Sequence, residues 1–304
     1  EDGMTPTVYL EADGLDTLAS IFINGQAAGM AENMHRRWSF PVGHLLKAGG
    51  NRIEIRFANA LEFCRKERER RRIYHAFETS PEIAFPGFNM IRKSHCSFGW
   101  DWGPIVPDVG IWREIRLVAP EPARISELRV RQRHEVKPDS TTVILEIQAG
   151  IERLYPHETS LTASLIHPDG RRQVFVVDGF GHAEIPIPDA RLWWPNGLGE
   201  QALYGLEIEL RDTGGLLDQR RIELGLRTLA VRRQADEWGE SFEFVVNGLP
   251  FFARGADYIP EDVALARVGA DRTERLVADC VKANFNCLRV WGGGVYPDAD
   301  FWRL

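Results

Sequence analysis

The 304-residue sequence contains only four cysteines and five lysines, and it has no long uninterrupted apolar run. The cysteines are Cys64, Cys96, Cys280 and Cys287. They show neither the CxxC spacing of a metal site nor the density of a disulfide framework, so we expect four free thiols. No run approaches the roughly 20 apolar residues that span a bilayer, which argues against a transmembrane helix.

Positive charge is also in short supply, since the formal net charge is −7. This balance argues against a nucleic-acid-binding protein, whose affinity depends on Lys and Arg neutralising phosphates. Residues Glu1–Met4 lack the basic and apolar regions of a signal peptide. Together with the thiols, this favours a cytoplasmic location. The composition, 44% hydrophobic and 27% charged, is that of a folded globular chain of two or more domains.

Residues 1–120 show the pattern of an antiparallel β-sandwich. Polar and apolar residues alternate over Val8–Ala12 and again over Arg52–Phe57. Between them, the apolar run Leu18–Asn24 ends at Asn24-Gly25, a pair that favours a two-residue hairpin turn. Short strands at this spacing predict an antiparallel sandwich.

The stretch Glu62–Arg72 interrupts this β pattern with a run of mixed charges. Such a run can form a basic recognition patch. We favour a solvated helix, because Glu67 and Arg71 are spaced i,i+4 and can pair on one helix face.

Residues 121–228 predict a second sandwich of immunoglobulin-like size. Alternating runs such as Thr142–Ile147 and Leu203–Leu210 recur with turn signals between them and without a helical period. The cluster Leu192–Gly197, with two adjacent tryptophans, can bind a ligand or fill a domain interface. No titratable group in this region indicates catalysis.

Residues 229–304 change from a β pattern to an alternating β/α pattern. A hairpin is followed by an amphipathic helix over Arg272–Ala283, an apolar strand over Asn286–Trp291 and a second helix near Asp300. Strand, helix, strand and helix are the start of a parallel α/β unit, of the kind that builds a (β/α)8 barrel. The carboxyl ends of barrel strands form the active site, which places Asp257, Arg289 and Trp291 on that face.

The segment Arg92–Pro104 holds the clearest candidate for a binding site. Its glycines and Pro104 predict a loop, in which Asp101 stands between Trp100 and Trp102. A carboxylate can accept hydrogen bonds from two sugar hydroxyls, while a Trp face packs on the apolar face of the ring. Equally, both tryptophans can be core residues, with Asp101 capping a turn.

Four motifs in order resemble β-mannosidases of glycoside hydrolase family 2. They are Gly-Trp-Asp-Trp-Gly-Pro at 99–104, Gly110–Arg113, Leu192–Gly197 and Arg289–Gly294. The resemblance covers almost the whole chain. It implies a mainly β fold: a jelly-roll sugar-binding domain at 1–120 that lacks its first strands, an immunoglobulin-like sandwich at 121–228, and the start of a TIM barrel at 229–304. Gly103 favours the branch that removes terminal mannose.

This resemblance implies a retaining exo-β-mannosidase that hydrolyses terminal non-reducing β-D-mannose residues. A pair of glutamates performs such a double displacement, one as nucleophile and one as acid and then base. The family carries them after later barrel strands, so neither catalytic glutamate is expected in this chain. A fragment that ends at Leu304 is therefore predicted to be inactive.

The resemblance also implies the substrate-binding residues. Asp101 would hold sugar hydroxyls, Trp100 and Trp102 would shape its loop, Trp291 would line the subsite and Arg289 would lie beneath it.

Two positions depart from the family pattern. Asp257 stands where the family has Asn, and Pro297 stands where it has Glu. A ligand role at either position is therefore uncertain from the sequence.

Other functions are compatible with the same sequence. They are a non-catalytic carbohydrate-binding module, a structural adhesion sandwich, or a family 2 hydrolase of the exo-β-glucosaminidase, β-galactosidase or β-glucuronidase type. No metal cluster is visible, so no cofactor is expected. The expected partners are β-mannoside oligosaccharides or glycans, not nucleic acid or a membrane, and the oligomeric state is unknown.

Overall fold

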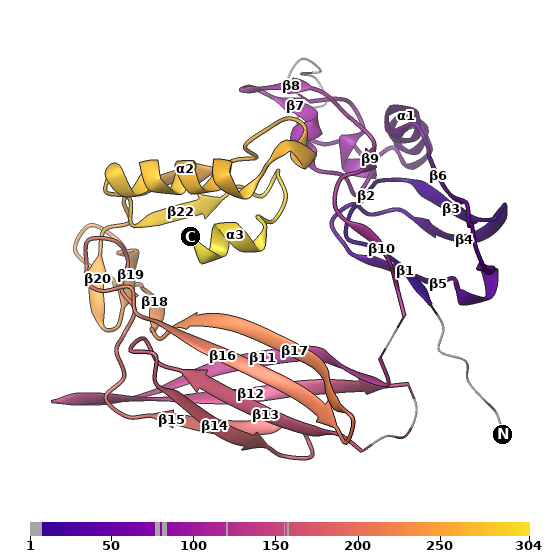
Figure 1. The fold of residues 1–304 in the computed structure, drawn as a ribbon. Helices are drawn as coiled ribbons and strands as arrows, with labels where there is room; N and C mark the ends of the chain where they lie inside the picture. The colour runs from indigo at the N-terminus through magenta and orange to yellow at the C-terminus, as the bar shows by residue number, and fades with distance from the viewer. Residues whose placement is uncertain (1–7, 77–79, 81–83, 120, 155, 157) are drawn as a thin grey trace. The chain divides into compact units, whose positions relative to one another are not determined.

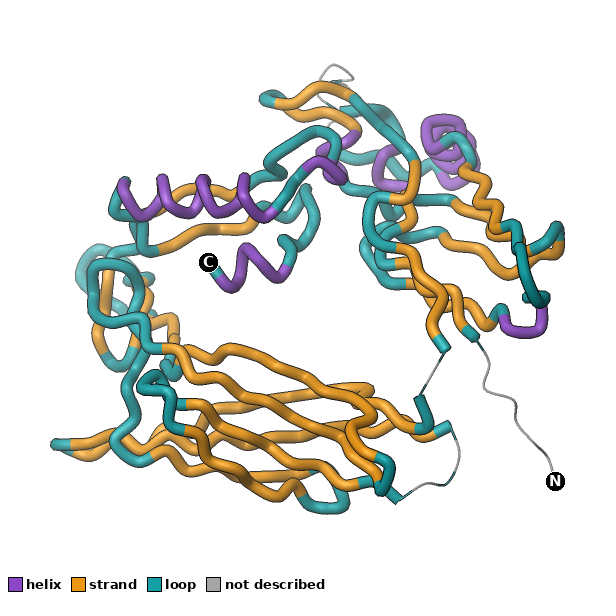
Figure 2. The backbone as a smooth tube through the Cα atoms, viewed as in Figure 1, coloured by secondary structure: helices purple, strands orange, loops and turns teal. Residues whose placement is uncertain are grey.

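The computed structural model describes residues 8–76, 80, 84–119, 121–154, 156 and 158–304. Residues Glu1–Met4, to which the signal-peptide prediction applies, lie outside these ranges. The chain divides into unit 1, residues 1–120, 257–277 and 289–304, and unit 2, residues 121–256 and 278–288. Strands dominate both (Figure 2), which confirms the prediction of a mainly β fold.

The first part of unit 1 contains two three-stranded antiparallel sheets (Figure 1). One has the order β10-β1-β5 and the other β4-β3-β6. Their strands are β1 (Tyr9–Ala12), β5 (Trp38–Pro41), β10 (Ile115–Val118), β3 (Ala19–Ile23), β4 (Gln26–Ala31) and β6 (Ile53–Phe57). The turn predicted at Asn24-Gly25 is confirmed, with φ of 52° and 83° at the two residues. A further pair, β2 (Leu15–Asp16) and β9 (Gly110–Ile111), is also antiparallel.

Apolar side chains of both sheets form the core of this sandwich. In β3, Ala19, Ile21 and Ile23 are buried while the residues between them are only partly covered. In β1, Leu10 and Ala12 are buried in the same alternating way. This period of two follows from side chains pointing to opposite faces of a strand.

The helix predicted over Glu62–Arg72 is confirmed as α1 (Ala60–Arg71). Asn59 begins it by accepting a hydrogen bond from the Glu62 amide at 3.0 Å. Glu67 pairs with Arg71 at 2.8 Å, as its spacing predicts. Hydrogen bonds from Arg70 and Arg71 lower the pKa of Glu67 to about 2.

Unit 2 is a two-layered sandwich (Figure 1). One sheet has the order β11-β12-β15 and the other β14-β13-β16-β17. The strands are β11 (Ala123–Lys137), β12 (Ser140–Arg153), β13 (Ser160–Ile166), β14 (Arg172–Val177), β15 (His182–Ile187), β16 (Leu203–Asp212) and β17 (Gly215–Gly225). Leu145 of the first sheet and Leu206 of the second are both fully buried in one shared core.

The chain then forms an antiparallel sheet of β18 (Leu229–Arg232), β19 (Glu243–Val246) and β20 (Leu249–Phe251). After it the elements alternate as predicted: β21 (Gly255–Tyr258), α2 (Ala270–Lys282), β22 (Cys287–Val290) and α3 (Ala299–Arg303). The Cys287 amide bonds to the Arg254 carbonyl and the Trp291 amide to the Tyr258 carbonyl. Because both partners advance together along the chain, β21 and β22 run parallel.

The apolar stripe of α2 is incompletely covered. Leu276, Val277 and Cys280 are half-buried, and Val281 is 50% exposed. A helix that buries its apolar face only partly needs more surface to pack against. No helix in the described ranges has the length and apolar character to cross a membrane.

Candidate functional site

The segment predicted as a loop at Arg92–Pro104 contains a short hairpin. Its strands are β7 (Phe98–Trp100) and β8 (Gly103–Ile105), with Phe98 opposite Ile105 and Trp100 opposite Gly103. This register leaves Asp101 and Trp102 as a two-residue turn. Gly99 adopts a φ of 97°, in the left-handed region where a side chain would be strained. The hairpin therefore carries Asp101 at its tip.

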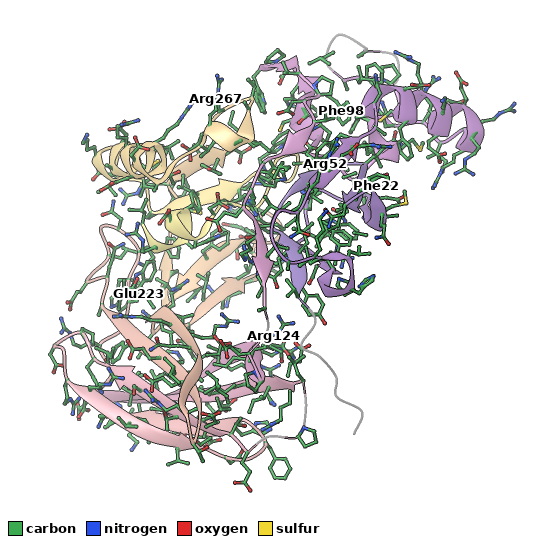
Figure 3. The ribbon with its side chains drawn as sticks, turned by 45° about the vertical axis from the view of Figure 1, so that its right-hand side comes forward. Phe22, Arg52, Phe98, Arg124, Glu223 and Arg267 are labelled. Atoms are coloured by element: carbon green, nitrogen blue, oxygen red, sulfur yellow. The ribbon has the colours of Figure 1, made fainter. Side chains whose placement is uncertain are left out.

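A buried aromatic cluster anchors the base of the hairpin. Phe98, labelled in Figure 3, is fully buried and lies with its ring centroid 6.2 Å from Phe85 and 6.3 Å from Phe88. The Phe85 amide also donates to the Phe98 carbonyl at 3.0 Å. The first strand of the hairpin is thus fixed to the core beside α1, while its tip projects away from that core.

Three of the predicted site residues meet in one aromatic cluster within unit 1. The ring of Trp291 lies with its centroid 5.6 Å from that of Trp100 and 5.4 Å from that of Trp102. The contact with Trp102 is edge-to-face, an arrangement favoured by the charge distribution of aromatic rings. Trp102 is still 46% exposed, so it is not a core residue.

Asp101 follows Trp100 and precedes Trp102 in the chain, and its side chain is exposed. Within the described ranges, no residue donates a hydrogen bond to its carboxylate. The structure therefore offers no support for a turn-capping role. An exposed carboxylate in the same turn as a half-exposed tryptophan suits a polyhydroxylated ring, which supplies hydroxyl donors and an apolar C–H face.

The remaining two predicted residues form an ion pair. The Arg289 guanidinium donates to the Asp257 carboxylate at 2.9 Å, and their side chains are 66% and 52% exposed. An exposed pair of this kind adds little stability. The pair does give the charge of Asp257 an oppositely charged partner. The asparagine of the family pattern is neutral, so it could form only a hydrogen bond with this arginine. The backbone bond from Trp291 to Tyr258 places both strand ends side by side.

The three glycines after Trp291 have different surroundings. A Cβ added to Gly293 would lie 2.2 Å from the Trp291 ring, and one added to Gly294 would lie 2.8 Å from Pro260. A Cβ on Gly292 would meet nothing within 4 Å. Gly293 and Gly294 therefore provide clearance for packing, which is one of the two roles that the sequence suggests. Gly293 provides it for Trp291, a predicted site residue.

We expect Gly293→Ala to displace the Trp291 ring from Trp100 and Trp102. The added methyl group would overlap the indole, and overpacking of this kind typically costs about 1–3 kcal/mol. The change should appear in the near-ultraviolet circular dichroism, which reports the packing of tryptophans. Gly292→Ala is the matched control and should leave the spectrum unchanged. Identical spectra for both variants would contradict the assigned packing role of Gly293.

The Leu192–Gly197 cluster serves packing within unit 2. The Trp193 ring lies against Gly225, with the Arg227 guanidinium 4.5 Å from its centroid. Asn247 donates to the Trp193 carbonyl at 3.0 Å, and Asn196 donates to the Phe285 carbonyl at 3.0 Å. These contacts favour the packing alternative over a ligand-binding role.

Two further charged groups of unit 1 carry no separate signal in the amino-acid sequence. Arg113 lies over the Trp112 ring at 4.2 Å and forms an ion pair with Asp298. Lys93 is fully buried and contacts Asp16 and Asp108. Arg113 belongs to the Gly110–Arg113 motif and Lys93 to the Arg92–Pro104 segment, but only the fold shows their partners. Among the described residues, no group of His, Cys, Asp and Glu could hold a metal ion.

Comparison with known proteins also points to glycoside hydrolases of family 2. A profile described as glycosyl hydrolase 2 galactose-binding domain-like matches residues 1–113, and one described as glycosyl hydrolases family 2 matches residues 123–227. The β-mannosidase of Bos taurus is 33% identical over 98% of this chain, which spans 35% of that protein.

Solved structures agree. The β-D-mannosidase of Dictyoglomus thermophilum is 32% identical, with a TM-score of 0.81, over 98% of this chain and 36% of that one. An FMN-binding β-glucuronidase from Facaelibacterium prausnitzii L2-6, at 16% identity and a TM-score of 0.67, shares the fold alone. Two consecutive family profiles and a close structural match lead to one conclusion: the chain belongs to glycosyl hydrolase family 2.

Proposed function

We propose that this chain is the N-terminal part of a retaining exo-β-mannosidase, and that Asp101 holds hydroxyls of the terminal mannose. The observation that carries the proposal is the cluster formed by the rings of Trp100, Trp102 and Trp291 at the turn that also carries Asp101, an exposed carboxylate without a partner in the described chain. The hairpin and the strand end reach this cluster from distant parts of the sequence. Such convergence is typical of a binding site.

Each side chain has a defined task in this proposal. The Asp101 carboxylate accepts hydrogen bonds from two neighbouring hydroxyls, which fixes the orientation of the sugar. Trp291 packs against the apolar face of the ring, while Trp100 and Trp102 hold Trp291 in place. Arg289 sits beneath the ring, and its pairing with Asp257 limits the directions in which its guanidinium can turn.

The chemistry itself belongs to a glutamate pair outside this chain. In a retaining glycosidase the two carboxyl groups stand about 5–5.5 Å apart, one attacking the anomeric carbon and the other protonating the leaving group. The described residues contribute substrate orientation, so that binding energy is used to bring the anomeric carbon to that pair. Three domains at 1–120, 121–228 and 229–304, the last being the start of the catalytic barrel, fit this separation of substrate binding from catalysis.

The relatives support this choice over other family 2 activities. The proteins of Bos taurus and Dictyoglomus thermophilum, both named as β-mannosidases, match nearly the whole chain at 32–33% identity. The half-covered stripe of α2 fits a barrel whose further strands and helices lie in the rest of a longer protein. The proposed substrates are accordingly β-mannosides.

We expect the full-length protein that carries this chain to hydrolyse 4-nitrophenyl β-D-mannoside. The matching β-D-galactoside, β-D-glucuronide and N-acetyl-β-D-glucosaminide should be turned over far more slowly, because each changes the hydroxyl pattern that Asp101 would read. Initial rates of 4-nitrophenol release under identical conditions would compare the four. A preference for any of the other three glycosides would assign a different family 2 activity.

A further inference from the structure

A buried lysine, Lys93, lies a few residues before the hairpin that carries Asp101. The Lys93 side chain is 0% exposed and forms ion pairs with Asp16 and Asp108, the latter at 3.3 Å. The Asp16 side chain is only 6% exposed, whereas that of Asp108 is 50% exposed. The ammonium is therefore enclosed and held between one buried and one accessible carboxylate.

The two carboxylates connect Lys93 to different parts of the fold. Lys93 precedes β7, and Asp108 follows β8, so the pair closes the segment 93–108 at its two ends. Asp16 belongs to β2 and stands opposite Gly110 of β9. One ammonium thus fastens both ends of the hairpin segment to the sandwich.

Backbone hydrogen bonds also hold the hairpin segment between the Lys93–Asp108 pair and the tip. The Val106 amide donates to the Ser97 carbonyl at 2.9 Å, and the Cys96 amide donates to the Gly293 carbonyl at 2.9 Å. Between these bonds and the turn, the hairpin register of the described chain has only the Phe98–Ile105 and Trp100–Gly103 pairs. The orientation of Asp101 therefore depends on the segment beneath it.

A buried ion pair of this kind is better explained by the arrangement of the chain that it selects than by a gain in folding stability. Removing two charges from water is costly, and a buried pair often stabilises a fold no more than apolar residues of similar volume would. Such pairs can instead select one arrangement among several, because any other arrangement leaves a buried charge without a partner.

We infer that Lys93 is a positioning residue, which sets the orientation of the Asp101 hairpin through its bonds to Asp16 and Asp108. The inference rests on the function proposed above for Asp101. It assigns no contact between Lys93 and the sugar. Its effect would pass through the stem of the hairpin to the carboxylate at the tip.

The most informative variant is Asp108→Asn. It weakens the accessible half of the network and leaves the buried Lys93–Asp16 pair in place, so the protein should still fold. In the full-length protein we expect kcat/KM for 4-nitrophenyl β-D-mannoside to fall about tenfold, since small misplacements of a binding group can cost up to about a hundredfold. Asp108→Glu keeps the charge and should recover part of the loss.

The matched control is Glu152→Gln in unit 2. Glu152 is 48% exposed and pairs at 2.8 Å with Arg124, which is labelled in Figure 3. This variant removes a comparably exposed carboxylate from an ion pair outside the hairpin. Its kcat/KM should equal that of the unmodified protein.

A second measurement on the 304-residue chain is independent of activity. Amide hydrogen exchange over residues 98–105 should be faster in Asp108→Asn than in Glu152→Gln, with far-ultraviolet circular dichroism unchanged. Unchanged exchange together with unchanged kcat/KM would overturn the inference. If the full-length protein fails to hydrolyse mannosides, the proposed function falls, and the exchange measurement still decides whether Lys93 and Asp108 hold the hairpin.

Discussion

Replacing Asp101 by alanine in the full-length protein is expected to lower kcat/KM toward 4-nitrophenyl β-D-mannoside by about a hundredfold or more. A hydrogen bond to a charged group is worth about 1.5–3 kcal/mol, and two such bonds to the sugar would be lost. Each 1.4 kcal/mol corresponds to about tenfold in the rate constant. Steady-state kinetics on the purified variant, with circular dichroism to verify folding, would measure the effect.

The chain offers a matched control for this substitution. Asp139 also stands in a tight turn, between β11 and β12, and is exposed. Asp139→Ala should leave kcat/KM unchanged, since it removes an exposed turn carboxylate from unit 2. Asp101→Asn keeps the size of the side chain without its charge and should lie between the two. A full-activity Asp101→Ala enzyme would remove Asp101 from the proposed site.

The second large effect concerns the 304-residue chain by itself, which we expect to show no hydrolysis of 4-nitrophenyl β-D-mannoside. In our proposal the catalytic glutamate pair lies outside these 304 residues, so neither attack on the anomeric carbon nor protonation of the leaving group would have a catalyst. The measurement compares 4-nitrophenol release by equal molar amounts of the chain and the full-length protein. Turnover by the chain that persists after contaminating glycosidases have been excluded would place the catalytic carboxylates within residues 1–304.

The same preparation distinguishes an enzyme fragment from a carbohydrate-binding module. Saturable binding of mannose or mannan to the 304-residue chain, abolished by Asp101→Ala, would support an independent binding function. In our proposal the exposed side chains of Trp102 and Asp101 form only one wall of the pocket. We therefore expect such binding to be much weaker than substrate binding by the full-length protein.

Local features of the fold followed directly from the sequence. The α1 helix was predicted from the spacing of Glu67 and Arg71, and the β3–β4 turn from Asn24-Gly25, because both depend on residues that are near neighbours in the chain. The hairpin at 98–105 was predicted as a loop. Its glycines and proline signal a break in regular structure, whereas its strand pairing depends on anchoring of Phe98 in a core built by other segments.

The candidate site shows the same division. The residue types at the site can be read from the order of the amino acids: a carboxylate between two tryptophans, a strand ending in Arg289 and Trp291, and glycines with room for packing. Their contacts appear only in the folded chain, where Trp100 and Trp102 meet Trp291, Asp257 pairs with Arg289 and Lys93 is enclosed. Periodicity and turn chemistry describe neighbours along the chain, while these contacts arise only when separate cores pack and bring distant segments together.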